Sequence, residues 1–474
     1  MAKICRVNLV HVSDPEVYGN PLSLGYLKAY ADSIFGKKVD IRIVESPKRW
    51  SGRGTDKVCA GILEGKPDIV GFSCYLWNVL AVIELCKELK RRSPKTRIVL
   101  GGPDASTRGA PILEETGADA LVMGEGELTF AELILKTIVK KPWEGTAGTI
   151  TFSKGGMVEG PQRPPIANLD IVPSPYLAGI FDGKPYKFLV HETSRGCPFN
   201  CSFCVWTSKG KIRRFSMTRA RQEIEWIIRN NALGRSRLSG DSTMHVFLAD
   251  QDLTMDETRA EEILGMIRKG ANGENLVWII ECDLKFWTPR IAAAGNFSGV
   301  SFCFGIQSTD RNIVRATGRT PLTLEQMMQK LYVAKEQAPK AYFLLQLMLG
   351  LPGDSLKGFI ESLRWCLDVC ADLQTTPVVT GSPEHLRRFS PDFQLYFTSG
   401  VQIFPVSVFP GTQLEKDAAK LGVDWDRKPP YYVKSTREFP AKDMENCVAL
   451  IRSLENFTGR LYSRPVVQMT LDTD

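Results

Sequence analysis

Three cysteines lie within eight positions of one another in the stretch SRGCPFNCSFCVWTSKG: Cys197, Cys201 and Cys204. Thiolates bind soft or borderline metals. A structural zinc site takes four protein ligands, usually as two separate pairs, and no partner pair follows here at a suitable spacing. A [4Fe-4S] cluster held by three cysteines keeps its fourth iron open to a small molecule. The spacing therefore favours the cluster, with zinc and plain buried or redox thiols as the alternatives.

The elements around these cysteines alternate between strand and helix. Strands are predicted within 187–196, 244–250, 276–284, 299–308, 341–350 and 401–408, with helical segments between them. About six βα units are fewer than the eight of a closed barrel, so we predict an open, partial (β/α)6 TIM-like barrel. The cysteines directly follow its first strand, and active sites of such folds lie at that end of the strands.

The first 140 residues also alternate, in the order of a doubly wound α/β fold. Near-continuous apolar runs such as ICRVNLV, DIVGFSCY and RIVLGG predict buried parallel strands. Between them, Val79, Val82, Ile83 and Cys86 recur at helical spacing. A Pro- and Gly-rich connection follows. We therefore predict a Rossmann-like domain over 1–140, a linker over 141–185, the partial barrel over 186–415 and a small C-terminal cap over 416–474.

Composition narrows the class of protein. The chain has 474 residues, of which 43% are hydrophobic and 24% charged, as expected of globular domains. A net charge of +7 is mild at this length, and the basic runs are short, so we expect no nucleic-acid partner. Twelve cysteines without a signal peptide indicate a reducing cytoplasm. No apolar run approaches the ~20 residues that cross a bilayer, so we expect no membrane span.

The motif CPFNCSFC has the form Cys-x-x-x-Cys-x-aromatic-Cys, and with it the chain resembles the radical S-adenosylmethionine (SAM) enzymes. In that family the amino and carboxylate groups of SAM bind the open iron. An electron from the cluster then breaks the sulfonium bond to give a 5′-deoxyadenosyl radical. The resemblance implies Cys197, Cys201 and Cys204 as cluster ligands, and a low-potential electron donor such as flavodoxin or ferredoxin as a partner.

The resemblance also implies contacts to SAM. Phe203 would pack near the adenine. FLADQDLTMD follows the second strand, where the family has a segment that binds the methionyl amine; the usual Gly-Gly-Glu is absent, which leaves Asp250, Gln251 and Asp252 as candidates. Glu281 is a candidate for holding a ribose or amino group, with a surface carboxylate as the alternative. The remaining candidates are Gln307, Ser308, Gly350 and Pro352.

Unusual loops follow three strands of the front domain: GFSCYLWN, VLGGPDAS and VMGEGELTF. Glycines let a bulky ligand approach the backbone, and helix N-termini favour a phosphate, although glycines also simply turn a chain. Together with the cysteine motif, these segments resemble the cobalamin-binding domain of the cobalamin-dependent radical SAM enzymes. No D-x-H-x-x-G motif is present, so the lower face of cobalamin is expected to lack a histidine ligand. The candidate cobalamin contacts are Ser73, Tyr75, Leu76, Trp77, Gly101, Gly102, Gly124, Glu125 and Gly126.

The function that this resemblance implies is a cobalamin-dependent radical SAM methyltransferase. One SAM methylates reduced cobalamin, and a second is cleaved at the cluster. The deoxyadenosyl radical removes hydrogen from an unactivated carbon of a small-molecule or peptide substrate, which then takes the methyl group. Two alternatives use the same motifs: a non-methylating ring formation, rearrangement or oxidation, and a radical SAM enzyme whose front domain no longer binds cobalamin.

Overall fold

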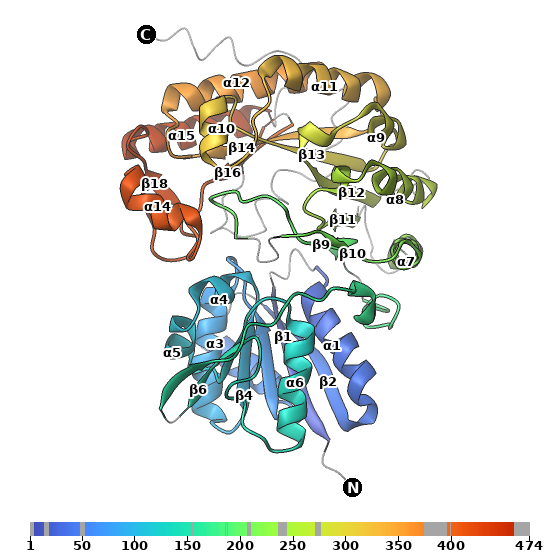
Figure 1. Cartoon of the computed structure of the whole chain (residues 1–474), viewed down its shortest axis with the longest axis vertical. Helices are drawn as coiled ribbons and strands as arrows, with labels where there is room; N and C mark the ends of the chain where they lie inside the picture. Colours follow the sequence, from blue (N-terminus) through green and yellow to red (C-terminus); the bar gives the residue numbers. More distant parts are fainter. Residues whose placement is uncertain are drawn as a thin grey trace. The chain divides into compact units, whose positions relative to one another are not determined.

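The computed structural model consists of two compact units, each built on one large sheet (Figure 1). The two units are described separately. The described residues are 4–13, 19–47, 53–153, 155–184, 186, 188–205, 210–235, 244–270, 276–373, 396–398 and 400–458.

The first sheet has the strand order β2-β1-β3-β4-β5-β6-β7. The first five strands in this order are parallel, and β1 lies between β2 and β3. These five strands are β1 (Cys5–Ser13), β2 (Val39–Pro47), β3 (Ile69–Ser73), β4 (Arg97–Gly101) and β5 (Ala120–Val122). The order 2-1-3-4-5 is the flavodoxin-like form of the doubly wound fold, so the predicted Rossmann-like architecture is confirmed.

Helices cover both faces of this sheet. On one face, α1 (Leu22–Phe35) and α6 (Gly126–Ile138) bury Leu24 and Phe130 against the strands. On the other face, α2 (Arg53–Ile62), α3 (Val79–Arg92) and α5 (Pro111–Thr116) form a second core, to which Val82 belongs. The short helix α4 (Pro103–Arg108) follows β4 directly. Two apolar faces explain why the strands are near-continuous apolar runs.

The sheet extends further along the chain than the sequence indicated. Within the range predicted as a linker, β6 (Thr149–Ser153) and β7 (Gly156–Glu159) form an antiparallel hairpin, and β6 pairs with β5. Beyond the hairpin, η2 (Leu169–Ile171) is a single 3-10 turn. Whether the three boundaries between the four predicted segments are the functional ones stays a prediction.

The second sheet has the order β15-β16-β14-β13-β12-β11-β8, and β12, β13, β14 and β16 run parallel. An open row of parallel strands in sequence order confirms the predicted partial barrel. Its strands are β8 (Phe188–His191), β11 (Met244–Leu248), β12 (Leu276–Cys282), β13 (Val300–Gln307), β14 (Tyr342–Leu349), β15 (Tyr396–Thr398) and β16 (Val401–Pro405). Its antiparallel edge strand β15 was not predicted.

Helices connect the strands of this second series. They are α7 (Met217–Arg235), α8 (Glu257–Gly270), α9 (Pro289–Ala294), α10 (Arg311–Ala316), α11 (Leu324–Gln337) and α12 (Leu356–Leu373). The last elements of the described residues are α14 (Gln413–Leu421), the hairpin of β17 (Asp424–Trp425) and β18 (Val433–Ser435), and α15 (Ala441–Thr458). Among the described residues, none of the helices has the length and apolar character needed to span a membrane.

Side chains alternate between the two faces of the sheet along β13. Phe302 and Phe304 pack against Trp287 with ring centroids 4.8 and 5.1 Å away, so they face the helical layer. Cys303 lies beside Glu281 of β12 in the parallel register, on the opposite face. The interior face of this sheet is therefore lined by small and polar side chains.

Candidate functional site

The cysteine segment is flanked by two short paired strands, which we call the neck. They are β9 (Ser194–Arg195), before the segment, and β10 (Arg213–Arg214), after it, and they pair antiparallel. Between these strands in the sequence, the backbone N–H of Gly210 donates to the Cys197 carbonyl at 2.7 Å. Gly196 has a φ of +106°, and a Cβ at this position would lie 2.6 Å from the Lys211 carbonyl oxygen. Only glycine fits there, so Cys197 leaves the neck along a fixed path.

The other two cysteines lie on a turn held from two sides. The N–H of Cys204 donates to the Cys201 carbonyl at 3.1 Å. Between them, the N–H of Ser202 donates to the Thr317 carbonyl at 2.8 Å, and the Ser202 carbonyl accepts the N–H of Leu414 at 2.9 Å. Cys197, Cys201 and Cys204 are all half-buried, unlike the fully buried cysteines of the cores. Half-buried thiols on a fixed backbone suit a cofactor that needs solvent-side access for a second ligand.

Asp252 has structural partners. Its Oδ1 caps η3 (Leu253–Met255) by accepting the N–H of Thr254 at 2.8 Å, and its Oδ2 accepts the N–H of Asp283 at 3.0 Å. Burial raises the pKa of this carboxyl to about 6, although these hydrogen bonds oppose the shift. Asp252 therefore ties the end of β12 to the loop after β11.

Gln251 differs from its neighbour. Both atoms of its side-chain amide are buried, and neither has a hydrogen-bond partner among the described residues. A buried amide without partners costs about 1–3 kcal/mol, so such a group needs an explanation. It follows β11, at the strand ends where the family places its SAM contacts. The side-chain amide of Gln251 thus has no hydrogen-bond partner among the described residues, and whether it contacts SAM stays a prediction.

Glu281 lies inside the barrel rather than on the surface. Gln346 of β14 donates to its Oε1 at 3.1 Å and to Oε1 of Gln402, on β16, at 3.0 Å. Burial raises the pKa of Glu281 to about 7. No local pattern in the sequence indicates this polar row, because its members come from strands far apart in the chain.

Gln307 stands at an irregular point of β13. The register with β14 shifts between Gly305 and Gln307, and Gln307 has a φ of +69°. A Cβ on Gly305 would lie 2.7 Å from the Gln307 Nε2 and 3.1 Å from an Arg319 nitrogen. The bulge thus turns the Gln307 amide toward Arg319, which also donates to the Asp283 carboxylate at 2.8 Å.

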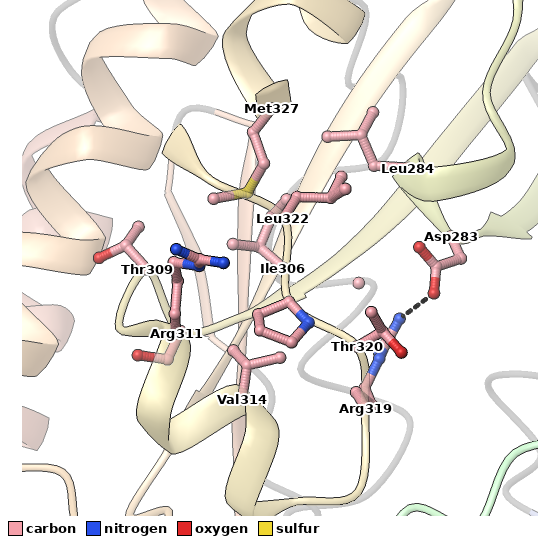
Figure 2. A pocket seen from close by; sticks show the side chains of 13 residues that line it. Asp283, Leu284, Ile306, Thr309, Arg311, Val314, Arg319, Thr320, Leu322 and Met327 are labelled. Atoms are coloured by element: carbon pink, nitrogen blue, oxygen red, sulfur yellow. Dashed lines mark hydrogen bonds and ion pairs between the residues drawn. The ribbon is translucent and has the colours of Figure 1, made fainter. Parts of the chain in front are cut away.

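A small cavity lies beside this group (Figure 2). Its volume of about 30 Å³ is too small to enclose SAM. Ser308, a SAM candidate, lines the cavity and accepts the N–H of Asp310 on its Oγ at 3.1 Å. Figure 2 shows Arg319 pointing to Asp283 at one side of the cavity and Met327 at the other.

The other SAM candidates are placed as follows. Phe203 is half-buried and Asp250 fully buried. Gly350 has a φ of +91°, and a Cβ there would lie 2.9 Å from Met444 of α15. The positive φ of Gly350 by itself favours glycine, and Pro352 follows at a half-buried position. Whether these residues contact SAM stays a prediction.

The loop after β3 presents aromatic side chains. Tyr75 and Trp77 stack with ring centroids 4.6 Å apart and planes inclined by 5°, and Trp77 is 44% exposed. Ser23 of α1 lies within hydrogen-bond distance of both Ser73 Oγ and Tyr75 Oη, at 3.3 and 3.2 Å. Three cobalamin candidates are therefore brought together at the carboxyl end of the sheet, and Leu76, a fourth, lies between the two rings in sequence.

A buried asparagine, which the sequence did not single out, holds this loop. Asn78 accepts the N–H of Tyr75 at 2.8 Å and donates to the carbonyls of Val12 and Ser73 at 3.2 and 3.1 Å. On the neighbouring strand, Gly102 has a φ of +92°, and a Cβ there would lie 2.6 Å from the Cys74 carbonyl oxygen. The loops after β3 and β4 thus pack backbone against backbone, with Gly101 ending β4.

The loop after β5 contains two glycines and, between them, a glutamate with several hydrogen-bond partners. Gly124 has a φ of +74° with open space around its Cα, and Gly126 opens α6. Glu125 between them is engaged: it accepts the N–H of Ile166 at 2.6 Å and binds Arg213 at 2.7 and 3.0 Å. Burial by itself would raise the pKa of Glu125, but these donors hold it below its usual value. Both carboxylate oxygens therefore have protein partners.

Comparison with known proteins finds similar sequences and similar folds. Residues 9–134 match the B12-binding domain family. The cobalamin-dependent radical SAM methyltransferase TokK of Streptomyces tokunonensis is 27% identical over 367 residues, which are 73% of this chain and 51% of TokK. An anaerobic magnesium-protoporphyrin IX monomethyl ester cyclase of Rubrivivax gelatinosus is 26% identical over 242 residues, 47% of this chain and 42% of the cyclase. The chain spans about half the length of the first curated relatives that it matches.

Solved structures share the fold. The cobalamin-dependent SAM radical enzyme OxsB with aqua-cobalamin bound superposes with a TM-score of 0.69 and 17% identity, over 96% of this chain and 68% of OxsB. The radical SAM methyltransferase TsrM of Kitasatospora setae, with cobalamin and a [4Fe-4S] cluster bound, gives 0.63 and 18%, over 95% and 91%. These solved structures share the fold of this chain, and the residues that match the B12-binding domain family lie in its first unit. In sequence and in fold, the chain is thus similar to cobalamin-dependent radical SAM enzymes.

Proposed function

We propose that the chain is a cobalamin-dependent radical SAM methyltransferase that methylates an unactivated carbon of a small molecule or peptide. The observation that carries the proposal is the cysteine segment: three half-buried thiols on a fixed backbone, in a chain whose front domain matches the B12-binding family. When bound, the cluster, SAM and cobalamin supply radical cleavage of SAM and delivery of a methyl group to carbon.

The residue types present suit these groups, although among the described residues no three His, Cys, Asp or Glu side chains already lie close enough together to hold a metal ion. Cys197, Cys201 and Cys204 would hold the cluster, because three thiolates leave one iron for SAM. Gln251 supports SAM binding, since its buried amide lacks a partner among the described residues. Trp77 supports cobalamin binding, because a large exposed ring at the carboxyl end of a parallel sheet is suited to a flat ligand.

Further candidates complete these two sets. For SAM they are Phe203, Asp250, Asp252, Glu281, Gln307, Ser308, Gly350 and Pro352. For cobalamin they are Ser73, Tyr75, Leu76, Gly101, Gly102, Gly124 and Gly126.

The chain's own contribution is positioning. Asn78 and Gly102 fix the loops that would receive cobalamin, and Asp252 fixes the loop that carries Gln251. Because the pKa of Glu281 is about 7, a part of the molecules would carry a protonated Glu281 at neutral pH, and this form would present an uncharged hydrogen-bond donor inside the barrel. Such fixed polar groups orient a ligand and displace water from it.

The proposed partners are a small-molecule or peptide substrate and a low-potential electron donor such as flavodoxin or ferredoxin. We place the enzyme in the reducing cytoplasm, because twelve cysteines without a disulfide among the described residues suit that compartment.

A ring formation, rearrangement or oxidation is the second candidate function, and the cyclase relative favours it. To distinguish the two, the anaerobically reconstituted chain is given hydroxocobalamin, a strong reductant, methyl-deuterated SAM and a small-molecule extract of the source cells. We expect a deuterated product, with S-adenosylhomocysteine and 5′-deoxyadenosine in similar amounts. Deoxyadenosine without S-adenosylhomocysteine would reject methylation and favour the second function. A protein that stays colourless after gel filtration with hydroxocobalamin would instead mean that the front domain does not bind cobalamin.

A further inference from the structure

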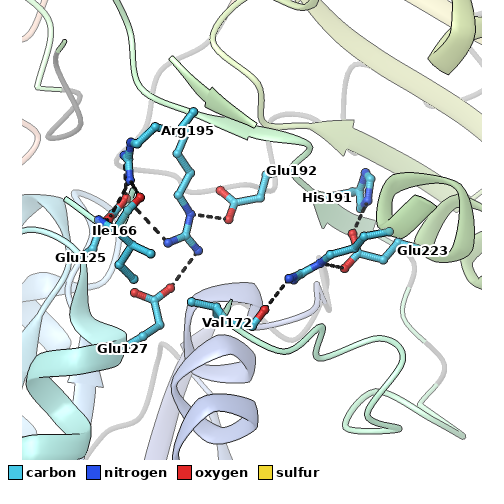
Figure 3. Close-up of polar contacts among 10 residues, drawn as sticks. Glu125, Glu127, Ile166, Val172, His191, Glu192, Arg195 and Glu223 are labelled. Carbon is cyan, nitrogen blue, oxygen red and sulfur yellow. Dashed lines mark hydrogen bonds and ion pairs between the residues drawn. The ribbon is translucent and has the colours of Figure 1, made fainter. Parts of the chain in front are cut away.

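Five buried or half-buried charged side chains meet at the neck of the cysteine segment (Figure 3). Two belong to the neck itself, because Arg195 of β9 and Arg213 of β10 are partners in the antiparallel pair. The carboxylates come from the front domain and from a residue shortly before β9: Glu125, Glu127 and Glu192. All three cysteine ligands of the proposed cluster lie between the two arginines in the sequence.

Each arginine is held by more than one acceptor. Arg195 donates to Glu127 at 2.8 Å and to Glu192 at 2.7 Å, and one of its nitrogens lies 3.7 Å from Glu125. Arg213 donates hydrogen bonds to both carboxylate oxygens of Glu125 and, at 2.7 Å, to the Ile166 carbonyl. Glu125 is thus shared by both strands of the neck.

Aromatic rings complete the enclosure of Arg195. Its guanidinium lies 4.9 Å from the Tyr26 ring and 5.7 Å from the Phe215 ring, and the whole residue is 9% exposed. Charges this well buried are held in place because separating them would leave one uncompensated, which costs roughly 3–5 kcal/mol. The neck therefore has little freedom while the carboxylates are intact.

We propose that Glu125 is a positioning residue: it clamps the β9–β10 neck and thereby sets the path on which Cys197 leaves it. This inference rests on the proposed function, since it takes Cys197 as a cluster ligand. It gives Glu125 a different role from the cobalamin contact predicted from its place between two glycines. In the same short loop, Gly124 and Gly126 stay candidates for contacts with cobalamin, while Glu125 binds the neck.

The test compares Glu125→Gln with a matched control, Asp119→Asn. Like Glu125, Asp119 accepts hydrogen bonds from more than one partner: the N–H of Ile98 at 2.6 Å and the Lys90 ammonium at 2.6 Å. Unlike Glu125, it precedes β5, and its partners lie outside the neck. Amide hydrogen exchange is measured on the full chain before cofactors are added. We expect exchange in peptides covering 194–205 and 210–214 to quicken at least about tenfold in Glu125→Gln and to stay unchanged in Asp119→Asn. Equal exchange of these peptides in both variants would overturn the proposal.

A double-mutant cycle separates the clamp from general destabilisation. Glu125→Gln and Arg213→Gln are combined, and we expect the double variant to exchange no faster at the neck than the faster single variant. Additive effects would show that the two side chains act independently, against the proposal.

The reconstituted chain supplies the readout on the cluster. Iron release to an anaerobic chelator should be at least about tenfold faster in Glu125→Gln than in Asp119→Asn, with the visible circular dichroism of the cluster altered only in the former. Identical release and spectra in the two variants would overturn the positioning role. If the unmutated chain takes up no iron at all, the proposed function fails, and the hydrogen-exchange result still decides whether the clamp exists.

Discussion

Gln346 donates its side-chain amide to Glu281 at 3.1 Å, inside the barrel. The pKa of Glu281 is raised from 4.5 to about 7, first of all by burial. The folded chain therefore keeps a proton that the unfolded chain releases. Protonation of Glu281 therefore stabilises the folded chain. This contribution to the free energy of unfolding is complete below about pH 4.5, is lost as the pH rises through 7, and is at most about 3 kcal/mol.

Glu281→Gln should flatten this pH dependence, because glutamine stays neutral. Denaturant unfolding at a series of pH values from about 5 to 8 measures it. We expect the unmutated chain to lose more stability across this range than the variant. Parallel curves for the two proteins would show that Glu281 is ionised in the folded chain throughout.

Gln251→Leu tests whether the buried amide awaits a ligand. Because neither amide atom has a protein partner among the described residues, its removal should leave the unfolding free energy unchanged or raise it by about 1 kcal/mol. SAM affinity, measured by calorimetry, should fall about tenfold. The control is Gln402→Leu. The side-chain oxygen of Gln402 accepts a hydrogen bond from Gln346, so this substitution should lower the free energy of unfolding by about 1–2 kcal/mol. Unchanged SAM affinity in Gln251→Leu would remove Gln251 from the site.

Gly102→Ala tests the packing of the front-domain loops. Gly109 is a suitable control, since it also has a positive φ, +65°, but a Cβ there would meet no atom within 4 Å. The clash with Cys74 should make Gly102→Ala about 2 kcal/mol less stable than Gly109→Ala. Hydroxocobalamin affinity, from spectral titration, should fall only for Gly102→Ala. Equal hydroxocobalamin affinity in the two variants would show that the packing of Gly102 does not affect cobalamin binding.

Cys201→Ala should abolish iron–sulfur absorbance after anaerobic reconstitution, because two thiols cannot hold the cluster. Cys370→Ala, in the buried face of α12, should keep the cluster and lose about 1 kcal/mol of stability. Iron and sulfide analysis of both variants is the measurement. A full iron complement in Cys201→Ala would contradict the assignment of its thiol.

Strand periodicity predicted most of the fold, since each core strand is a local apolar run. The hairpin of β6 and β7 was not predicted, although TITFSKGGMVE carries β-branched residues and a Gly-Gly turn, which together are typical of a hairpin. The Pro- and Gly-rich segment directly after it favoured a linker, and that local signal outweighed the hairpin pattern.

The site was less predictable, because its contacts join residues far apart in the sequence. Glu125 lies between two glycines, which suggested a cofactor contact, but its partner Arg213 is 88 positions away. The bulge at Gln307 and the row from Glu281 to Gln402 likewise depend on strand register. Only the cysteine motif carried its chemistry within a single short stretch.

Anaerobic reconstitution of the full chain with iron and sulfide, followed by addition of SAM and a strong reductant, tests the central claim most directly. We predict about four irons per chain and formation of 5′-deoxyadenosine, both lost when Cys197, Cys201 and Cys204 are replaced together by alanine. A chain that holds zinc in place of iron, or that holds iron and leaves SAM intact, would contradict the account.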